Sequence, residues 1–252
     1  MRYVFVILIF ALLIPFVLSK NIVKESIQNQ TINEPSTPHS KLKEIGHKYK
    51  QYRYGIFTLD ENQQLSFNLN TRDKKTSEEI ISTEKCKSLI NGGFYDKEGD
   101  PIGWVVVNSD EMYPSQKNQL LDGFISASQS GELKISKNKS LNFDFGLQTG
   151  PILIYEGGVK NLKIKNDEPK RRSIVLESTN NKPYFLTIVS GDSLFEGSLL
   201  KDLPQLVAKI ANQEDISIIN AINLDGGSAS AFYSQENKIS EIQTIGSYFC
   251  IK

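Results

Sequence analysis

The sequence predicts an α+β fold, with a large mixed, mostly antiparallel sheet and a few packed helices. Three observations support this prediction. Short runs rich in β-branched and aromatic residues recur along most of the chain, and polar or glycine-containing turns separate them. Only one long segment has clear helical spacing. The 252 residues, 39% of them hydrophobic, suffice for one domain with a short extension. Many strands combined with few helices are typical of the α+β class.

Residues 1–19, MRYVFVILIFALLIPFVLS, form an apolar leader. Arg2 is a short basic region before an apolar run at residues 3–18, which is shorter than the ~20 apolar residues of a membrane-spanning helix. We therefore expect a signal peptide that is cleaved after Ser19, and an uncleaved N-terminal anchor is the alternative. In either case the rest of the chain is predicted to be exported, periplasmic or extracellular, with membrane contact only through this segment.

Residues 20–43 predict a flexible tether between the leader and a folded domain at residues 44–252. They are rich in Asn, Ser, Thr, Gln and Lys, include two prolines and show no hydrophobic periodicity. Across the chain 29 basic and 29 acidic side chains balance, and no long basic run occurs. Nucleic acid is therefore not an expected partner.

The domain is predicted to begin with two strands, at residues 52–59 and 65–70, around a polar turn. A short helix, TSEEIISTEK, follows, with Thr76 or Ser77 as its N-cap. The clearest helix is SLLKDLPQLVAKIANQ, which has helical spacing and which we expect to begin near Pro204. The other segments predicted as strands are residues 88–96, 103–109, 123–128, 132–136, 145–158, 171–178, 183–190 and 219–227.

Histidine is expected to be almost missing from the folded part, because His39 and His47 lie in or beside the tether. This excludes a Ser-His-Asp or Cys-His mechanism and a histidine-built zinc site. The chain also has no P-loop and no G-x-G-x-x-G sequence. We expect no cofactor and no metal, although carboxylate and carbonyl oxygens would suit Ca²⁺ or Mg²⁺. Catalysis would then depend on carboxylates, arginine, amides, hydroxyls and backbone N–H groups.

The only two cysteines, Cys86 and Cys250, allow two interpretations. Export would permit a disulfide. The sequence alone cannot bring their Cα atoms together, so we favour two small core residues on strands.

Glycines and polar groups lie at the ends of two predicted strands. In Asn91-Gly92-Gly93-Phe94 the glycines would let a ligand approach the backbone, and Asn91 would offer an amide. A turn with an Asn cap is the alternative. Thr149, before Gly150 and a proline, either offers a hydroxyl or belongs to an ordinary Gly-Pro turn.

Two adjacent arginines, Arg171 and Arg172, open another predicted strand. Neighbouring strand residues point to opposite faces, so at most one arginine can face a given pocket and the other is expected in solvent. An arginine at a strand end can clamp a phosphate or a carboxylate. Two surface arginines are the alternative interpretation.

One acid, Asp225, follows the apolar run IINAINL and precedes two glycines. An acid is expensive to bury unless it is hydrogen-bonded or used. The stretch is therefore either an Asx turn, in which the acid accepts the N–H groups of the turn, or a catalytic carboxylate beside an anion-binding loop.

Five features occur in this order: NGGFYD…PIGW, LQTGPIL, RRSIVLE, the amphipathic helix and INLDGGSAS. On these features the chain resembles the phosphodiester glycosidase family, most closely its exported bacterial members. The resemblance extends over roughly residues 54–249. It implies an α+β fold around a central sheet, with the shared residues gathered in one cleft. It implies Asp225, Arg172 and Asn91 as catalytic residues, with Arg171 as the alternative assignment of the arginine. The substrate-binding residues that it implies are Gly92, Gly93, Phe94, Thr149, Gly150, Gly226, Gly227, Ser228 and Ser230.

The reaction that the resemblance implies is hydrolysis of a sugar-1-phosphodiester to a free sugar and a phosphomonoester. A phosphate leaving group needs charge stabilisation more than a proton, which Arg172, Asn91 and the glycine N–H groups would supply. Asp225 would act ionised, as a base for water or beside the oxocarbenium-like centre, so its pKa need not be raised. Ile174 and Ala229 depart from what the family often has at these positions. The alternatives are therefore a non-catalytic envelope protein that binds a glycan or phosphopolymer, and a purely structural exported domain.

Overall fold

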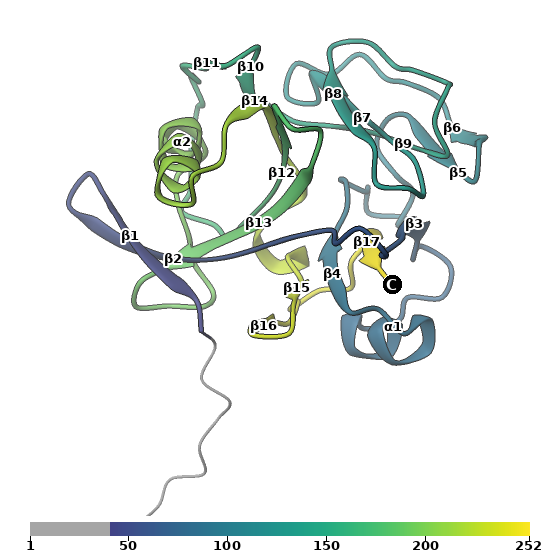
Figure 1. Cartoon of the computed structure of the whole chain (residues 1–252), viewed down its shortest axis with the longest axis horizontal. Helices are drawn as coiled ribbons and strands as arrows, with labels where there is room; N and C mark the ends of the chain where they lie inside the picture. Colours follow the sequence, from purple (N-terminus) through teal and green to yellow (C-terminus); the bar gives the residue numbers. More distant parts are fainter. Residues whose placement is uncertain (1–40) are drawn as a thin grey trace, which may run out of the picture. The chain divides into compact units, whose positions relative to one another are not determined.

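The computed structural model describes residues 41–252, drawn in colour in Figure 1. The predicted leader at residues 1–19 and most of the predicted tether lie outside the described residues. Every strand pair within residues 41–252 is antiparallel. The predicted α+β class with a mostly antiparallel sheet is confirmed, although the strands divide among three sheets. No helix in this part of the chain is long and apolar enough to cross a membrane.

The largest sheet has seven strands and holds the central pair β12 and β14. In these strands Ile174 lies opposite Asn223, so the start of β12 lies beside the end of β14. From one edge to the other, the strands are β1 (Lys43–His47), β2 (Lys50–Thr58), β13 (Pro183–Ser190), β12 (Arg172–Ser178), β14 (Ile218–Asn223), β10 (Ile152–Tyr155) and β11 (Gly158–Val159).

Two five-stranded sheets complete the β structure. The first contains β16 (Lys238–Ile239), β15 (Phe232–Tyr233), β4 (Ser88–Asn91), β17 (Ser247–Ile251) and β3 (Leu65–Leu69). The second contains β6 (Asp110–Tyr113), β5 (Val105–Val107), β9 (Phe145–Thr149), β7 (Gly123–Ala127) and β8 (Leu133–Ser136).

Helix α2 covers one face of the large sheet, and the two smaller sheets pack against the other face (Figure 1). Alternate residues of β12 divide between these faces, as the period of a strand requires. Ile174 and Leu176 belong to the hydrophobic cluster that contains Leu206 of α2, whereas Val175 belongs to the cluster that contains Phe249 of β17. This burial on both faces explains why the middle of β12, Ile174-Val175-Leu176, is an unbroken apolar run.

The helices begin where the sequence predicts. Thr76 is the N-cap of α1, and its capping box with Glu79 satisfies two backbone N–H groups at the helix start. Pro204 lies in the first turn of α2, where its missing N–H removes no helical hydrogen bond. The helical segments are α1 (Ser77–Glu84), the 3₁₀ turn η1 (Leu200–Asp202), α2 (Leu203–Gln213) and the 3₁₀ turn η2 (Gly227–Ala229).

His47 ends strand β1 and is 8% exposed, so the expectation that the folded part lacks histidine is wrong. The segment KEIGH is mostly polar, and only Ile45 and His47 are buried. An edge strand with one buried face needs so few apolar residues that its sequence resembles a tether. Burial lowers the pKa of His47, against the raising effect of Asp202.

Cys86 and Cys250 form a disulfide with Cα atoms 5.5 Å apart, which corrects their interpretation as separate core residues. Strand β17 pairs with β4, and this register sets Cys250 opposite Leu89. Cys86 precedes β4 by only two residues, so its sulfur lies close enough to Cys250 on the neighbouring strand to form the bond. The pairing joins residues 164 apart in sequence, which local patterns do not reveal.

Candidate active site

A cavity of about 320 Å³ opens where β14 leaves the large sheet and β12 enters it. Its volume is that of a small-molecule site, and its walls combine apolar side chains with a few polar groups. The lining residues that the sequence singled out are Phe94, Gly150, Arg172, Asp225 and Gly226. The other lining residues are Ile102, Asn118, Leu120, Leu121, Pro151, Lys170, Leu200 and Asn223.

Strand register brings three polar residues to this cavity. Ile174 pairs with Asn223, and the Leu224 N–H donates to Ser173 O at 2.8 Å, so the pairing continues past the end of β14. Arg172 and Asp225 follow at the next positions of the two chains, and both line the cavity. Alternation puts the side chains at positions 172, 223 and 225 on the face that α2 covers.

Backbone contacts fix Asp225 beside the cavity. Its N–H donates to Gly92 O at 3.0 Å, and its carbonyl accepts from Asn91 Nδ2 at 2.8 Å. Its carboxylate Oδ1 accepts the Gly226 N–H at 2.8 Å. Burial raises the pKa of Asp225 to about 7, against the lowering effects of this hydrogen bond and of the Lys170 charge. Asp225 is therefore a carboxyl group that titrates near neutral pH, which the mechanism expected from the sequence did not require.

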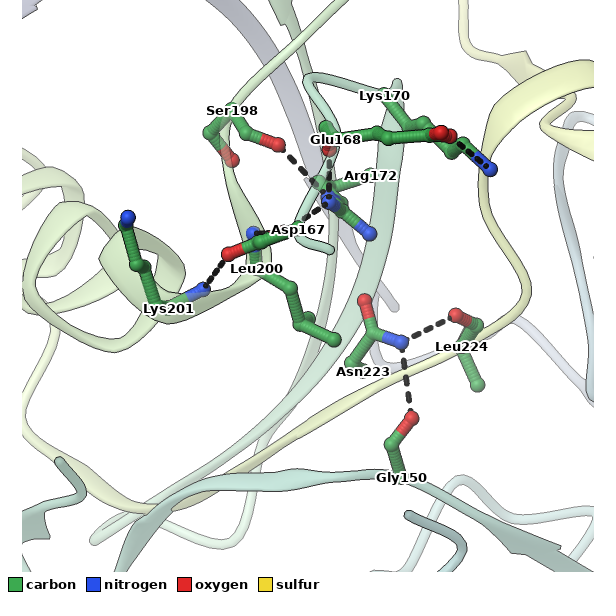
Figure 2. A network of polar contacts seen from close by, with 10 residues as sticks. All are labelled: Gly150, Asp167, Glu168, Lys170, Arg172, Ser198, Leu200, Lys201, Asn223 and Leu224. Atoms are coloured by element: carbon green, nitrogen blue, oxygen red, sulfur yellow. Dashed lines mark hydrogen bonds and ion pairs between the residues drawn. The ribbon is translucent and has the colours of Figure 1, made fainter. Parts of the chain in front are cut away.

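Two backbone carbonyls and one acid hold the guanidinium of Arg172 (Figure 2). Nε donates to Ser198 O at 3.0 Å, Nη2 donates to Glu168 O at 3.0 Å, and Nη2 lies 3.8 Å from Asp167 Oδ1. In Figure 2 the third guanidinium nitrogen is turned away from these oxygens, and no group within residues 41–252 accepts from it. Burial lowers the pKa of Arg172 to about 10, against the raising effect of Asp167, so the side chain stays protonated at neutral pH.

The loop before β12 supplies charges that sequence reasoning missed. Asp167 is fixed at the start of η1, where it accepts the N–H groups of Leu200 at 2.9 Å and Lys201 at 2.8 Å. From there it partly compensates the buried arginine. Lys170 lines the cavity and pairs with Glu168 at 3.0 Å, and its side chain is 53% exposed. It adds a second, solvated positive charge at the mouth.

Asn91 lies behind Asp225 and is only 1% exposed. Its Nδ2 donates to the Asp225 carbonyl, and its Oδ1 accepts from Ser173 Oγ at 2.6 Å and from the Ala231 N–H at 3.1 Å. The amide thus has its partners inside the protein. The structure makes Asn91 a positioning residue that ties β4, β12 and the Asp225 loop together.

Arg171 is 2% exposed, which corrects the expectation that the second arginine is solvated. Its guanidinium donates to Gly227 O at 3.0 Å, Ser240 O at 2.8 Å and Ser228 O at 3.4 Å. Alternation holds, because Arg171 and Arg172 go to opposite faces. Both faces are covered by protein. The loop after Asp225 accepts hydrogen bonds from Arg171, and the loop before β12 accepts one from Arg172.

The N–H groups of four predicted glycines all have acceptors within the protein. The glycines permit close packing, since a Cβ at Gly226 would lie 2.7 Å from Arg171 O. The N–H groups of Gly226, Gly227, Gly92 and Gly93 donate to Asp225 Oδ1, Arg171 O, Ser247 O and Ser247 Oγ, respectively.

The Thr149-Gly150 segment supports the end of β14. Thr149 is fully buried, and its Oγ1 donates to Asn223 O at 2.8 Å, so its hydroxyl does not reach the cavity. Gly150 lines the cavity, and its carbonyl accepts from Asn223 Nδ2 at 2.9 Å (Figure 2). A Cβ at Gly150 would lie 2.2 Å from Leu120 O, so only glycine fits there.

The remaining predicted residues have different surroundings. Phe94 contributes an apolar wall of the cavity beside Ile102. Ser228 Oγ donates to Gln243 Oε1 at 2.6 Å, outside the cavity lining. Ser230 is 1% exposed and also lies outside the lining. Five of the predicted site residues therefore line the cavity, and the other predicted residues lie outside its lining.

Comparison with known proteins matches residues 84–252 of this chain to the phosphodiester glycosidase family, over more than half of its length. The chain belongs to the phosphodiester glycosidase family. The resemblance seen in the sequence is thus confirmed. A search of curated proteins finds no match.

Two solved structures illustrate the fold of this phosphodiester glycosidase family member. A hypothetical protein from Synechocystis has a TM-score of 0.64 at 12% identity, and the match covers 83% of this chain and 61% of that protein. The catalytic domain of zebrafish N-acetylglucosamine-1-phosphodiester alpha-N-acetylglucosaminidase, auto-inhibited by its pro-peptide, has a TM-score of 0.60 at 15% identity. That match covers 83% of this chain and 81% of the zebrafish chain. At these identities the likeness shows the fold alone.

For some residues that line this cleft the sequence contained a predictive pattern, and for others it contained none. Asn223 precedes Asp225 by two positions on a predicted strand, so alternation alone would have placed both on one face. Asp167 and Lys170 lie in a polar loop without a pattern. Within residues 41–252 no group of three or more His, Cys, Asp or Glu side chains is arranged as a metal site.

Proposed function

We propose that this chain is an exported hydrolase that cleaves a sugar-1-phosphodiester to a free sugar and a phosphomonoester. Membership of the phosphodiester glycosidase family supports the reaction class. The observation that carries the proposal is the presence of Arg172 and Asp225 on one cavity. A fixed cation and a titratable carboxyl that line one cavity suit a substrate whose anionic phosphate adjoins the reacting C1 carbon.

The phosphate would lie against Arg172, whose third guanidinium nitrogen has no acceptor within residues 41–252. Lys170 would add a second positive charge from the mouth of the cavity. A departing phosphate is already stable as an anion, so these cations take the place of the general acid of ordinary glycosidases. They also stabilise the phosphate in place of the glycine N–H groups, which donate hydrogen bonds within the protein.

Asp225 would act as the general base. In its ionised form it takes a proton from water while the water oxygen bonds to C1. The bond between C1 and the phosphate oxygen breaks, and the phosphomonoester leaves with its electron pair. A pKa of about 7 suits a base that works at neutral pH. Only the ionised form accepts a proton, so kcat/KM should rise with pH and level off above about 7.

Export is part of the proposal, from the apolar leader at residues 1–19. The disulfide between Cys86 and Cys250 supports it, because such bonds persist in oxidising compartments and are rare in the cytosol. A glycan or phosphopolymer of the cell envelope is then the natural substrate class.

Product analysis tests the reaction. The full chain is incubated with a panel of sugar-1-phosphodiesters that includes UDP-N-acetylglucosamine, beside Asp225→Asn and the surface control Asp192→Asn. We expect free reducing sugar and a phosphomonoester from the wild type and from Asp192→Asn, and none from Asp225→Asn. Sugar-1-phosphate as the product would mean attack at phosphorus and would overturn the role of Asp225.

Two further readings of the same panel distinguish the alternatives. A pH profile that falls above pH 7, instead of rising towards it, would make Asp225 a general acid. Binding without any product would favour the non-catalytic glycan-binding or phosphopolymer-binding protein.

A further inference from the structure

The side-chain amide of Asn223 has a fixed orientation. Its Nδ2 donates to Gly150 O at 2.9 Å and to Leu224 O at 2.7 Å, as Figure 2 shows. These two bonds use both hydrogens of the amide nitrogen. A flipped amide would turn its oxygen towards two carbonyl oxygens, so the hydrogen-bond network leaves one orientation.

This orientation leaves the other end of the amide without a partner. Asn223 is 2% exposed, and no donor within residues 41–252 reaches its Oδ1. The residue lines the cavity beside Arg172 and Asp225. A buried acceptor that stays unpaired is unfavourable, and most such groups in folded proteins have a partner. A ligand that fills the cavity therefore binds well only if it brings an N–H or O–H to this oxygen.

The position along the strand indicates which part of a sugar would bring this donor. Asn223 and Asp225 both line the cavity, and the intervening Leu224 is fully buried in the core on the other face. Their Cα atoms are then about 7 Å apart. If Asp225 acts at C1, the acceptor lies near the atoms next to C1. These are the ring oxygen and the bridging phosphate oxygen, which carry no hydrogen, and C2.

We propose that Asn223 Oδ1 accepts a hydrogen bond from the substituent on C2 of the sugar, a hydroxyl or an acylamino N–H. Asn223 thereby selects sugars with a donor at this carbon against 2-deoxy and 2-O-substituted sugars. The identity of the ligand as a sugar-1-phosphodiester rests on the proposed function. The fixed and unpaired acceptor rests on the structure of the chain itself.

A binding panel on one protein tests this without depending on turnover. The full chain carrying Asp225→Asn is titrated by calorimetry with glucose 1-(methyl phosphate) and with its 2-deoxy, 2-deoxy-2-fluoro and 6-deoxy analogues. The fluoro analogue keeps the size of the substituent but carries no donor. We expect both C2 analogues to bind about tenfold to a hundredfold more weakly than the parent, and the 6-deoxy analogue to bind within about threefold.

A second variant assigns the effect to the amide. Adding Asn223→Ala should abolish the preference for the parent over the C2 analogues. The matched control is Asn118→Ala, which removes another amide that lines the cavity. Asn118 Oδ1 already accepts the N–H groups of Leu120 at 2.9 Å and Leu121 at 3.4 Å, so this variant should retain the preference. The panel without Asn223→Ala remains decisive if that variant fails to fold.

The outcomes separate this inference from the proposed function. Equal affinities for the parent and both C2 analogues would overturn the inference, even if the wild type cleaves the parent. A loss at C6 in place of C2 would also overturn it. A preference at C2 without any cleavage by the wild type would support the inference and refute the proposed function. Failure of every sugar to bind, together with no cleavage, would overturn both.

Discussion

Replacing Asp225 with Asn should stabilise the fold above neutral pH while it removes activity. In the wild-type chain, burial raises the pKa of Asp225 from the ordinary 3.8 to about 7. Between these values the folded state keeps a proton that the unfolded state has released. The free energy of unfolding therefore falls as pH rises from about 4 to 7 and stays lower above that range. Asparagine carries no charge and keeps an oxygen acceptor for the Gly226 N–H.

The size of the effect follows from the two pKa values. They differ by about 3 pH units, and each unit corresponds to about 1.4 kcal/mol, so the full destabilisation is about 4 kcal/mol. Asp225 as a residue is half-buried and lines the cavity, so contact with solvent reduces the effect. We expect Asp225→Asn to raise the free energy of unfolding by about 1–3 kcal/mol at pH 8 and by less than about 0.5 kcal/mol at pH 4.

Urea denaturation at pH 4 and pH 8, followed by far-ultraviolet circular dichroism, measures this difference. The control is Asp192→Asn, at an exposed aspartate whose pKa is lowered by a hydrogen bond from Ser190. That variant should gain no stability at pH 8. An Asp225→Asn protein that is no more stable than the wild type at pH 8, or equally stabilised at both pH values, would refute the reasoning.

Three further predictions concern the frame of the site. Replacing Cys86 and Cys250 by serine opens a loop of 164 residues and should lower the free energy of unfolding by up to about 5 kcal/mol in urea denaturation; an unchanged midpoint would contradict this. Arg172→Lys should lower kcat/KM about a hundredfold and weaken inhibition by inorganic phosphate. Arg171→Lys should mainly lower the melting temperature. Equal phosphate inhibition in both variants would refute the assignment of Arg172 as the phosphate-binding arginine. Gly150→Ala, whose Cβ would meet backbone at 2.2 Å, should cost at least about 2 kcal/mol of stability, and a loss below about 0.5 kcal/mol would count against the packing argument.

The sequence predicted well those elements whose pattern of apolar and polar residues matches the faces that are buried in the fold. The middle of strand β12 is buried on both faces, and its residues Ile174-Val175-Leu176 are all apolar. Helix α2 buries one stripe of residues and has helical spacing. The N-cap of α1 depends on Thr76 and Glu79, which are only three residues apart. A local sequence pattern is therefore enough to predict it. Strand β1 was missed because only one of its faces is buried and its other residues are polar.

Features that join distant residues were not predictable in the same way. The disulfide depends on the pairing of β17 with β4, which brings the two ends of the family domain together. The burial of Arg171 depends on carbonyl groups up to 69 residues further along the chain. Alternation along β12 correctly separated Arg171 from Arg172, but it carries no information about what covers each face.

The glycine stretch after Asp225 has a structural explanation that differs from its usual association with phosphate. Gly226 lies against the Arg171 carbonyl, and the N–H groups of Gly226 and Gly227 are occupied. The missing side chains let this loop pack beside the start of β12, where the Gly227 N–H donates to Arg171 O at 2.9 Å. Asn223, Asp225 and Arg172 all line the cavity at this point. The close packing removes water from the carboxyl of Asp225, and this desolvation raises its pKa to about 7. A larger residue at Gly226 would push the two chains apart and lower this pKa together with the stability of the pairing.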